Sequence, residues 1–355
     1  MRARPTSSHS TTSHSHEPPC LPPRVLGASG SKVVAGYASI DFKRMAKHSI
    51  LTGGAGFIGS HLADALLAAG EEVTVIDDLS SGSAAKVPSG ARLCELDIVD
   101  RAALQRVFDE VKPSAVYHLA AQASVTASVA DPGRDCAVNV LGTLNVVDAA
   151  TKLGAPLSFT STGGALYGDD APLPTSEQRI PAPLAPYGAS KWAAEAYVKT
   201  WSLSSGVPHA ICRLGNVYGP RQSPHGEAGV VAIFSDHLHT GKTPKMFGHG
   251  KPTRDYVYVG DVVSALIAAN GTRGTFNIAT GVETDVATLW SVLKQAASSQ
   301  IEPELADLRP GELKRSCLDT SLATRELGWR ATVTIEDGLR RTYAALVEEF
   351  EGVAS

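Results

Sequence analysis

From His48 onward, short runs of apolar and β-branched residues alternate with longer stretches in which apolar residues recur every three or four positions. The short runs have the length and composition of buried strands, and the longer stretches have the period of amphipathic helices. This alternation is typical of crossover units around a parallel sheet, so we predict an α/β fold with a Rossmann-type doubly wound parallel sheet. The predicted strands are Ile50–Thr52, Glu72–Asp77, Arg92–Glu95, Ala115–Leu119, Leu157–Ser161 and His209–Leu214, with helices beginning near Phe57, Arg101, Arg134 and Tyr187.

The pattern changes near both ends of this alternating region. Residues 1–44 are crowded with Ser, Thr, His and Pro, a composition that favours a disordered tail. Met45 lies just before the first strand, and we hypothesise that the functional chain begins there or that the tail is a targeting arm. After Gly219 the elements become shorter, with a helical pattern near the end. We predict a mainly NAD-binding Rossmann domain over residues 45–215 and a smaller C-terminal α/β substrate lobe mainly over 216–355, with the chain crossing between them.

Composition narrows the possible partners. The chain has 355 residues and a formal net charge of −4, which gives no general attraction to nucleic acid or to an anionic membrane. No apolar run reaches the roughly 18 residues of a membrane span. The five cysteines are scattered, which favours a reducing cytoplasm over a disulfide scaffold. Three tail histidines have no partners at ligand spacing, so we expect no metal; they are His9, His14 and His16.

A glycine-rich turn joins the first strand to the first helix. Glycines at this point let the backbone approach a pyrophosphate at the positive end of the helix. The second strand ends at Asp77 and Asp78, within the interval at which an acid accepts from the adenosine ribose and repels a 2′-phosphate, so NAD is favoured over NADP. The alternative is a turn that only packs helix on sheet. The candidate residues of the turn are Gly53, Gly56, Phe57, Ile58 and Gly59.

Two later strand ends, and the helix that follows the second of them, extend this candidate cofactor site. Asp97 could face the adenine with Ile98 packed on the ring, or it could cap the next helix. Asn139 could touch the nicotinamide side, or it could anchor a loop as an internal polar bridge. Between them, small residues at a strand end would let a cofactor pass closely, namely Ala120 and Ala121, followed by Gln122.

A Tyr–Lys pair provides the candidate chemistry. Tyr187 and Lys191 are four residues apart at a helix start and therefore share one face. A free tyrosine is a poor base at neutral pH, and a fixed ammonium and a positive nicotinamide would both favour its phenolate. Upstream, Ser161 and Thr162 end a strand and could hydrogen-bond the reacting oxygen, or could only cap the turn. On spacing alone, such a Tyr–Lys pair is more often an ordinary exposed helix pair.

The order of these features resembles the extended short-chain dehydrogenase/reductase family, and within it the UDP-glucose 4-epimerases, over residues 48–346. The resemblance implies a triad of a hydroxyl residue, Tyr187 as the base, and Lys191, which also holds the nicotinamide ribose. The segment "TSTGGALYG" carries one residue more than many members of the family. Counting from the strand gives Thr162 the hydroxyl role, with Ser161 in reserve, whereas counting back from Tyr167 would place Gly163 there.

The same resemblance supplies candidate substrate residues in the second lobe. It implies that two arginines hold the diphosphate of a UDP-sugar, for which forked guanidinium groups are suited. Without the resemblance, surface ion pairs with Asp255 and Asp307 would be the simpler interpretation. The residues implied in diphosphate, nucleotide and lobe contacts are Asn216, Arg254, Tyr256, Arg309 and Glu312.

Two sequence details bear on the reaction. Dehydratase relatives carry an Asp–Glu pair before the Tyr–Gly of the hydroxyl strand, whereas this chain has Gly164, Ala165 and Leu166 there. Epimerisation at C4 of a UDP-hexose through a 4-keto intermediate is therefore expected. The resemblance implies that Ser316 lies near C2 of the sugar and limits the size of its substituent, and this small residue would also admit N-acetylated hexoses. A nucleotide-sugar dehydratase or oxidoreductase and a non-catalytic NAD-binding regulator are the alternatives. The resemblance also implies a homodimer through a four-helix interface.

Overall fold

The computed structural model describes residues 47–224, 229–309 and 313–353. Predictions for the tail, for Met45 as the start and for Glu312 lie outside these residues. A seven-stranded sheet forms the centre, in the order β11-β6-β5-β4-β1-β2-β3, with every pairing parallel. Its strands are β1 (His48–Thr52), β2 (Glu72–Asp77), β3 (Arg92–Glu95), β4 (Ala115–His118), β5 (Leu157–Thr162), β6 (His209–Leu214) and β11 (Gly274–Ile278). The six predicted strands are confirmed, and β11 was not predicted.

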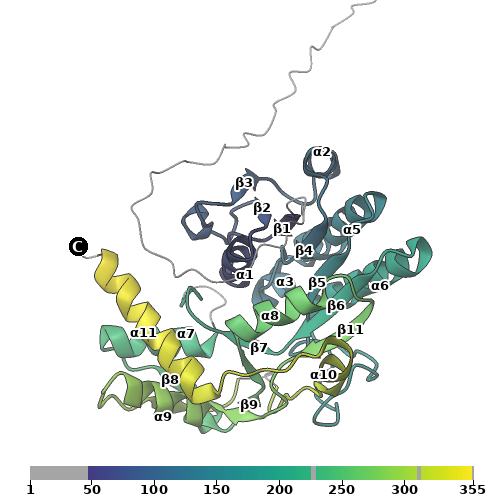
Figure 1. The fold of residues 1–355 in the computed structure, drawn as a ribbon. Helices are drawn as coiled ribbons and strands as arrows, with labels where there is room; N and C mark the ends of the chain where they lie inside the picture. Colours follow the sequence, from purple (N-terminus) through teal and green to yellow (C-terminus); the bar gives the residue numbers. More distant parts are fainter. Residues whose placement is uncertain (1–46, 225–228, 310–312, 354–355) are drawn as a thin grey trace, which may run out of the picture.

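Helices cover both faces of the sheet, as the doubly wound prediction requires (Figure 1). One face packs against α1 (Phe57–Ala68), α8 (Val259–Ala269) and α10 (Ser321–Leu327), and the other against α2 (Arg101–Val111), α5 (Thr143–Lys152) and α6 (Pro186–Ser205). Two apolar cores result because each strand is buried on both sides. The strand order reverses between β1 and β4, and ligands of such folds bind outside the carboxyl ends of strands at this point.

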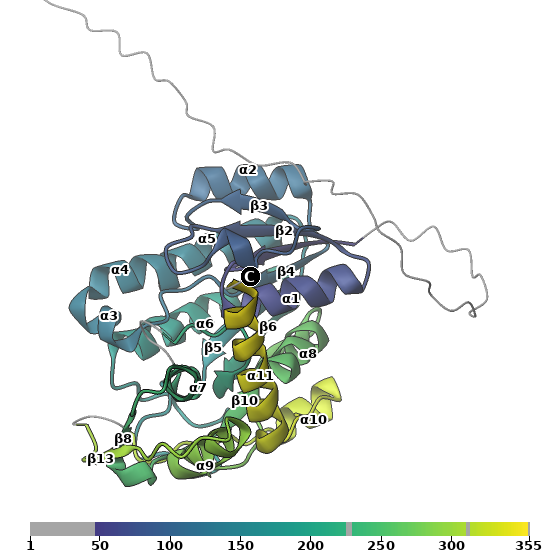
Figure 2. The same ribbon diagram turned by 90° about the vertical axis from the view of Figure 1, so that its left-hand side faces the viewer.

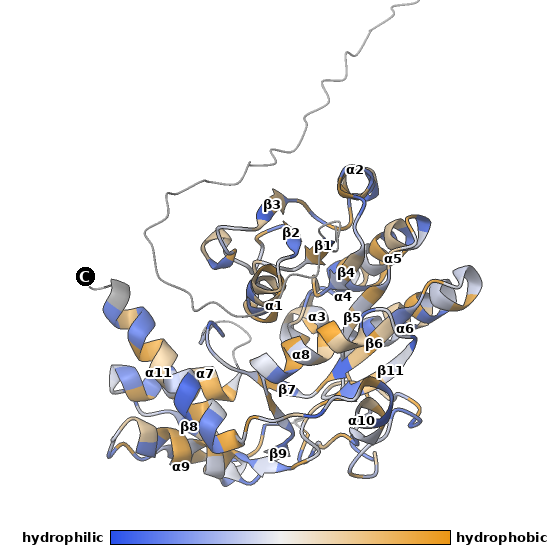
Figure 3. Ribbon diagram, viewed as in Figure 1, coloured by the Kyte–Doolittle hydropathy of each residue, from blue (hydrophilic) through white to orange (hydrophobic). Residues whose placement is uncertain are grey.

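A smaller lobe packs below this sheet. Its apolar core joins α7 (Val230–Thr240), α9 (Val286–Ala296) and α11 (Ile335–Val353), and Figure 3 shows the apolar residues on α7 and α9. Three two-stranded sheets complete it: β7 (Asn216–Tyr218) with β10 (Tyr256–Tyr258), β8 (Lys245–Phe247) with β13 (Glu304–Ala306), and β9 (Thr253–Arg254) with β12 (Thr284–Asp285). Because α8 and β11 return to the large sheet, the chain crosses between the two parts. A division into two domains near residue 215 stays a prediction.

The segment between β4 and α5 lies beside α6 (Figure 2). It comprises α3 (Val125–Ala130), α4 (Pro132–Cys136) and the π-helical segment η2 (Ala137–Gly142). Short 3₁₀ turns occur at η1 (Ala84–Lys86) and η3 (Gly248–Gly250). None of the helices in the described ranges is long and apolar enough to cross a membrane.

Candidate active site

A cavity of about 960 Å³ opens at the carboxyl ends of the central strands. It brings together segments that are far apart in the chain, from the glycine turn after β1 to the first two turns of α6. Most of the predicted cofactor and catalytic residues line it: Gly53, Gly56, Phe57, Ile58, Gly59, Asp77, Asp78, Asp97, Ile98, Ala120, Ala121, Gln122, Ser161, Thr162, Tyr187 and Lys191. The sequence therefore located one continuous site.

The glycine turn is built so tightly that side chains would not fit. Gly53 has a φ of +73°, and a Cβ atom there would lie 2.5 Å from the backbone nitrogen of Ala120. A Cβ at Gly59 would lie 2.2 Å from the carbonyl oxygen of Gly53. Helix α1 begins directly after Gly56, and within the described residues no side chain caps it. Its first N–H groups are thus suited to an anion such as a pyrophosphate.

Asp77 fixes the glycine turn to the end of β2. Its carboxylate accepts hydrogen bonds from the backbone nitrogens of Ala55 at 2.9 Å and Leu79 at 3.0 Å. Burial raises the pKa of Asp77, and these two hydrogen bonds act against that shift. The carboxylate keeps acceptor capacity for a further donor, because an ionised carboxylate has about four lone-pair sites.

Asp97 does not cap a helix, so that alternative is wrong. Asp100 is the N-cap of α2 and accepts from the backbone nitrogen of Ala103 at 3.0 Å. Asp97 instead accepts from the backbone nitrogen of Val99 at 2.9 Å and pairs with Arg134 at 3.3 Å. Arg134, which the sequence did not single out, also lines the cavity and lies 3.5 Å from Asp78.

Asn139 holds the loop that follows β4. Its side chain accepts from the backbone nitrogen of Gln122 and donates to the carbonyl oxygen of Gln122, both at 2.9 Å, and it also donates to Asp135 and Ser190. Among the described residues, Asn139 is not part of the cavity lining. The geometry therefore favours the loop-anchoring interpretation over contact with a nicotinamide.

His118 continues this hydrogen-bond chain through the buried interior. The Thr143 hydroxyl donates to the carbonyl oxygen of Asn139 at 2.6 Å, so it can only accept from His118 Nε2 at 2.9 Å. His118 Nδ1 then accepts from the Thr52 hydroxyl at 2.7 Å, and burial lowers the pKa of His118 to about 3. A neutral imidazole with its proton on Nε2 thus links β1, β4 and the start of α5.

Tyr187 and Lys191 lie on one face of α6, as predicted, and both reach the cavity. The Lys191 ammonium lies 4.3 Å from the centre of the Phe159 ring, a cation–π contact. Burial lowers the pKa of Lys191 to about 7, against the charges of Glu195 and Asp135. Desolvation raises the pKa of Tyr187 to about 12. Burial thus disfavours the phenolate in the protein by itself, and the combined effect of Lys191 and a positive nicotinamide stays a prediction.

Two hydroxyl groups at the end of β5 face the same cavity. Thr162 accepts from the backbone nitrogen of Ala165 at 3.1 Å, and a hydrogen bond between its side chain and Tyr187 acts to lower the pKa of the phenol. Ser161 Oγ is buried and has no hydrogen-bond partner among the described residues. Buried hydroxyls are normally paired, so Ser161 is ready to bond a ligand.

Four predicted substrate residues lie in the second lobe, and the chain neighbours of one of them, Asn216, line this cavity. Asn216 is exposed in β7. Its side-chain oxygen lies close to Gly164, because a Cβ atom added to Gly164 would be 3.4 Å from that oxygen. Arg254 donates to the carbonyl oxygen of Thr253 at 2.9 Å, and Arg309 lies 4.0 Å over the Phe247 ring. Tyr256 is packed into the apolar core of the lobe. None of these four lines the 960 Å³ cavity within the part of the chain that the structure describes.

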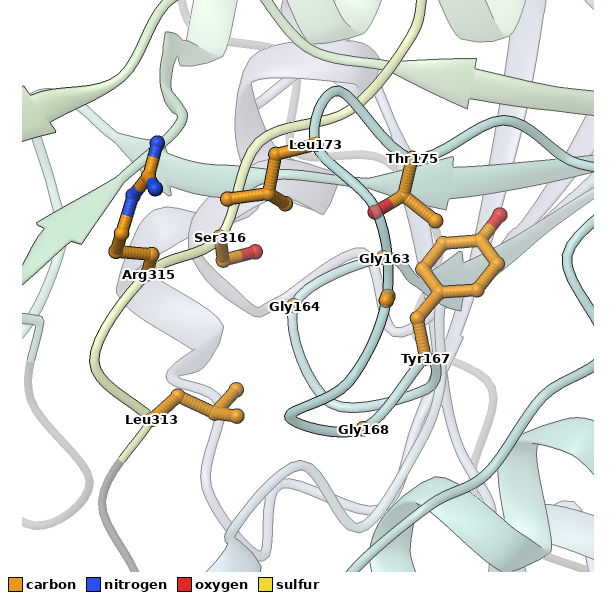
Figure 4. A pocket seen from close by; sticks show the side chains of 10 residues that line it. Gly163, Gly164, Tyr167, Gly168, Leu173, Thr175, Leu313, Arg315 and Ser316 are labelled. Atoms are coloured by element: carbon orange, nitrogen blue, oxygen red, sulfur yellow. The ribbon is translucent and has the colours of Figure 1, made fainter.

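Ser316 lies at a smaller hollow beside the hydroxyl strand (Figure 4). The hollow lies between the Gly163–Gly164 turn and the segment that carries Ser316, with Tyr167 on a further side. A Cβ at Gly163 would lie 2.4 Å from Leu318, so the turn packs tightly against that segment. The sequence placed Ser316 beside the sugar end of the site, and the structure puts it next to the strand end that carries Thr162.

A buried polar cluster behind α6 was missed by the sequence analysis. Arg213 in β6 donates to both carboxylate oxygens of Glu195, at 2.9 and 2.6 Å, and to the Tyr167 hydroxyl at 2.8 Å. Tyr167 in turn donates to Asn277 in β11 at 2.9 Å. Glu195 lies one helical turn beyond Lys191, and this spacing was the available signal.

A glycine turn at a helix start, a buried acid after β2 and a Tyr–Lys pair on one cavity define a dinucleotide-dependent enzyme with a Rossmann-type sheet. Comparison with known proteins agrees with this class. The family model described as "NAD dependent epimerase/dehydratase family" matches residues 49–279, and the chain belongs to this family. A "UDP-glucose 4-epimerase" from Mycolicibacterium smegmatis is 45% identical over 83% of this chain and 96% of its own length.

Solved structures give the same result. The UDP-glucose 4-epimerase of Thermotoga maritima with UDP-glucose is 41% identical, with a TM-score of 0.83, and the match covers 85% of this chain and 99% of that one. The Thermus thermophilus UDP-glucose 4-epimerase in complex with NAD is also 41% identical, with a TM-score of 0.78, over 84% of this chain and 99% of that one.

Proposed function

We propose that this protein inverts C4 of a UDP-linked hexose, interconverting UDP-glucose and UDP-galactose through a 4-keto intermediate. The observation that carries the proposal is the meeting of Tyr187, Lys191 and Thr162 in a cavity whose other end is the glycine turn. An acid–base group beside a redox cofactor is what such a reaction needs, and this arrangement supports the proposal. The two related structures with UDP-glucose and with NAD support the same assignment.

The cavity fits the NAD that the family uses. Gly53 and Gly59 leave room only for backbone, and Ser161 Oγ is a buried hydroxyl without a partner among the described residues. When bound, NAD supplies the oxidation of C4 and its reduction from the opposite face. We assign the pyrophosphate to the start of α1, the adenosine ribose to Asp77, and the adenine side to Asp97 and Ile98.

Tyr187 is the proposed base for the 4-hydroxyl proton, and Thr162 hydrogen-bonds the same oxygen. The pKa of Tyr187 is raised to about 12 in the protein alone, so further positive charge at the site is needed to favour the phenolate. Lys191 supplies part of it and holds the nicotinamide ribose. Because the Thr162 hydrogen bond lowers the pKa of Tyr187, Thr162 is preferred to Ser161 as the catalytic hydroxyl.

Asn216, Arg254 and Arg309 are the proposed tether for the diphosphate, about which the keto sugar turns to present its other face. Gly164, Ala165 and Leu166 offer no acid–base pair for loss of water, which favours epimerisation over the dehydratase alternative. Ser316, beside the Gly163–Gly164 turn, has a small side chain, and this small size is the basis for proposing that a substituent at C2 is accepted. We therefore include N-acetylated UDP-hexoses among the candidate substrates.

Replacement of Tyr187 by phenylalanine tests the proposal. Tyr187→Phe removes the proton acceptor, and we expect turnover of UDP-galactose, without added NAD, to fall at least about 100-fold, within the usual contribution of acid–base catalysis. Product sugars are resolved by chromatography, with UDP-N-acetylgalactosamine assayed in parallel. Tyr197→Phe, at an exposed position on the same helix, is the control and should keep wild-type turnover. Normal turnover in Tyr187→Phe would reject the mechanism, and a keto-deoxy product or net NAD consumption would favour the alternatives.

We further propose a homodimer. Large apolar side chains are exposed on the side of the molecule formed by α3, η2 and α6: Val129 is 64% exposed, Leu141 46% and Trp192 42%. Helices α3 and α6 lie on the same side of the molecule in Figure 2. A patch of this kind is typical of a protein–protein interface. The cytoplasmic location expected from the cysteine pattern stays a prediction.

A further inference from the structure

A short segment, which we call the strap, follows β7 and contacts helix α1 and the turn η1. The strap consists of residues 218–223, which directly follow the first residues of β7. Its backbone is held by the other part of the molecule: Pro220 accepts from His61 Nε2 at 2.9 Å, and Arg221 accepts from Lys86 Nζ at 2.9 Å. The Arg221 side chain also pairs with Asp64 at 2.6 Å. Three side chains, His61 and Asp64 of α1 and Lys86 of η1, therefore bind two consecutive strap residues.

The strap backbone adopts a conformation that these contacts must maintain. Arg221 has a φ of +64°, in the left-handed region that a residue with a Cβ rarely adopts. Such a conformation persists only where the surroundings enforce it. The Gln222 side chain donates to the carbonyl oxygen of Val217 at 3.2 Å and closes the strap on itself.

The residue just before the strap and the last residue of the strap belong to the wall of the cofactor cavity. Val217 and Ser223 line the cavity, and so do Phe57 of α1 and Gly82 just before η1. A Cβ at Gly219 would lie 2.4 Å from Val259 and 3.7 Å from the Phe57 ring, so the strap runs close above the start of α1. The segment thus runs beside the start of α1 at the wall of the cavity.

We propose that Asp64, Lys86 and Arg221 are positioning residues that set the residence time of bound NAD, by holding the strap against α1 and η1 at the wall of the cavity. An epimerase returns the hydrogen it removes, so early loss of reduced cofactor would strand the keto sugar. The inference uses the NAD dependence of the family and is independent of which sugar is epimerised. Release of the dinucleotide requires the strap to leave α1 and η1.

The experiment measures exchange of NAD from the purified holoenzyme. Enzyme carrying its own NAD is mixed with excess radiolabelled NAD, and incorporation of label is followed over time. The variants are Asp64→Asn, which removes the ion pair, and Lys86→Met, which removes the donor to the strap. We expect exchange to be about threefold faster in each and about tenfold faster in the double variant, the range for partly exposed polar contacts.

Glu110→Gln is the matched control, because it removes one partner of an arginine–carboxylate pair, Arg92–Glu110, outside the cavity lining. Its exchange rate should equal that of the wild type, and the thermal midpoints of all variants should agree within a few degrees. Two results would overturn the proposal: a double variant that exchanges within twofold of the wild type, or equal acceleration by Glu110→Gln. Free exchange of NAD in the wild type, complete within the mixing time, would overturn it as well.

Discussion

At the scale of single residues, burial disfavours the charged forms of both the Tyr187 phenol and the Lys191 amine. Desolvation raises the pKa of Tyr187 to about 12 and lowers that of Lys191 to about 7. Asp135, a buried carboxylate that accepts from Gln122 and Asn139, raises the pKa of both groups. Burial and Asp135 therefore act together on the phenol and against each other on the amine.

Lys191 should cost the folded protein stability at low pH. Its pKa in the fold is below the ordinary value, so below about pH 7 the fold must hold an ammonium that the unfolded chain solvates better. The penalty disappears as pH rises toward the ordinary value near 10.5. Lys191→Met, freed of NAD, should therefore be more stable than the wild type at pH 6, by an amount on the order of a few kcal/mol. The gain should shrink by pH 9.5, as measured by chemical denaturation.

Lys199→Met provides the comparison for this measurement. Lys199 lies two turns further along α6 and is exposed, so its replacement should change stability little at either pH. A gain for Lys191→Met that is equal at pH 6 and pH 9.5 would contradict the expected titration and would point to packing alone.

At the scale of elements, α6 carries the proposed catalytic pair and is attached to β6 on its other side. Tyr187, Lys191 and Glu195 follow one another at four-residue intervals, the first two toward the cavity and the third against Arg213 of β6. The Arg213–Glu195 pair is buried, with side-chain exposures of 7% and 6%, so water does not screen it. Through Tyr167 and Asn277 the same cluster ties α6 to β11, the strand that returns from the second lobe.

Breaking this pair should be costly. Glu195→Gln leaves the Arg213 guanidinium buried without a counter-charge, and we expect the free energy of unfolding to fall by about 3–5 kcal/mol. Equilibrium denaturation in urea measures the change. Glu110→Gln, in an exposed pair, should lose less than about 1 kcal/mol. Similar losses in the two variants would show that the buried pair contributes no more than a surface pair.

At the scale of the whole molecule, the proposed dimer can be tested by a substitution in its proposed interface. Trp192→Glu places a charge at an exposed apolar position of α6, where a partner would have to bury it without a counter-charge. We expect the wild type to sediment as a dimer and Trp192→Glu as a monomer at micromolar concentration. Leu305→Glu, at another exposed apolar position, in β13, should leave the dimer intact. A monomeric wild type would contradict the proposal.

Much of the fold follows from local pattern. Six strands of the sheet could be predicted because each is a short apolar run flanked by a helical period, and such units pack in few ways. β11 was missed because Gly274–Ile278 follows the region where the alternation breaks, and its partner β6 lies about 60 residues earlier in the chain. The residues of the proposed cofactor site could be predicted because glycines and Asp77 occupy fixed places around one strand–turn–helix unit.

The sequence by itself determined which residues could do chemistry: the glycine turn, Asp77, Ser161, Thr162 and the Tyr187–Lys191 pair. Only the tertiary structure decided their electrostatic state, because desolvation depends on everything packed around a group and not on its neighbours in the chain. It likewise decided that Asn139 anchors a loop, that Asp97 pairs with Arg134, and that a strap from the second lobe meets α1. These contacts join residues tens to more than a hundred positions apart, which no local pattern encodes.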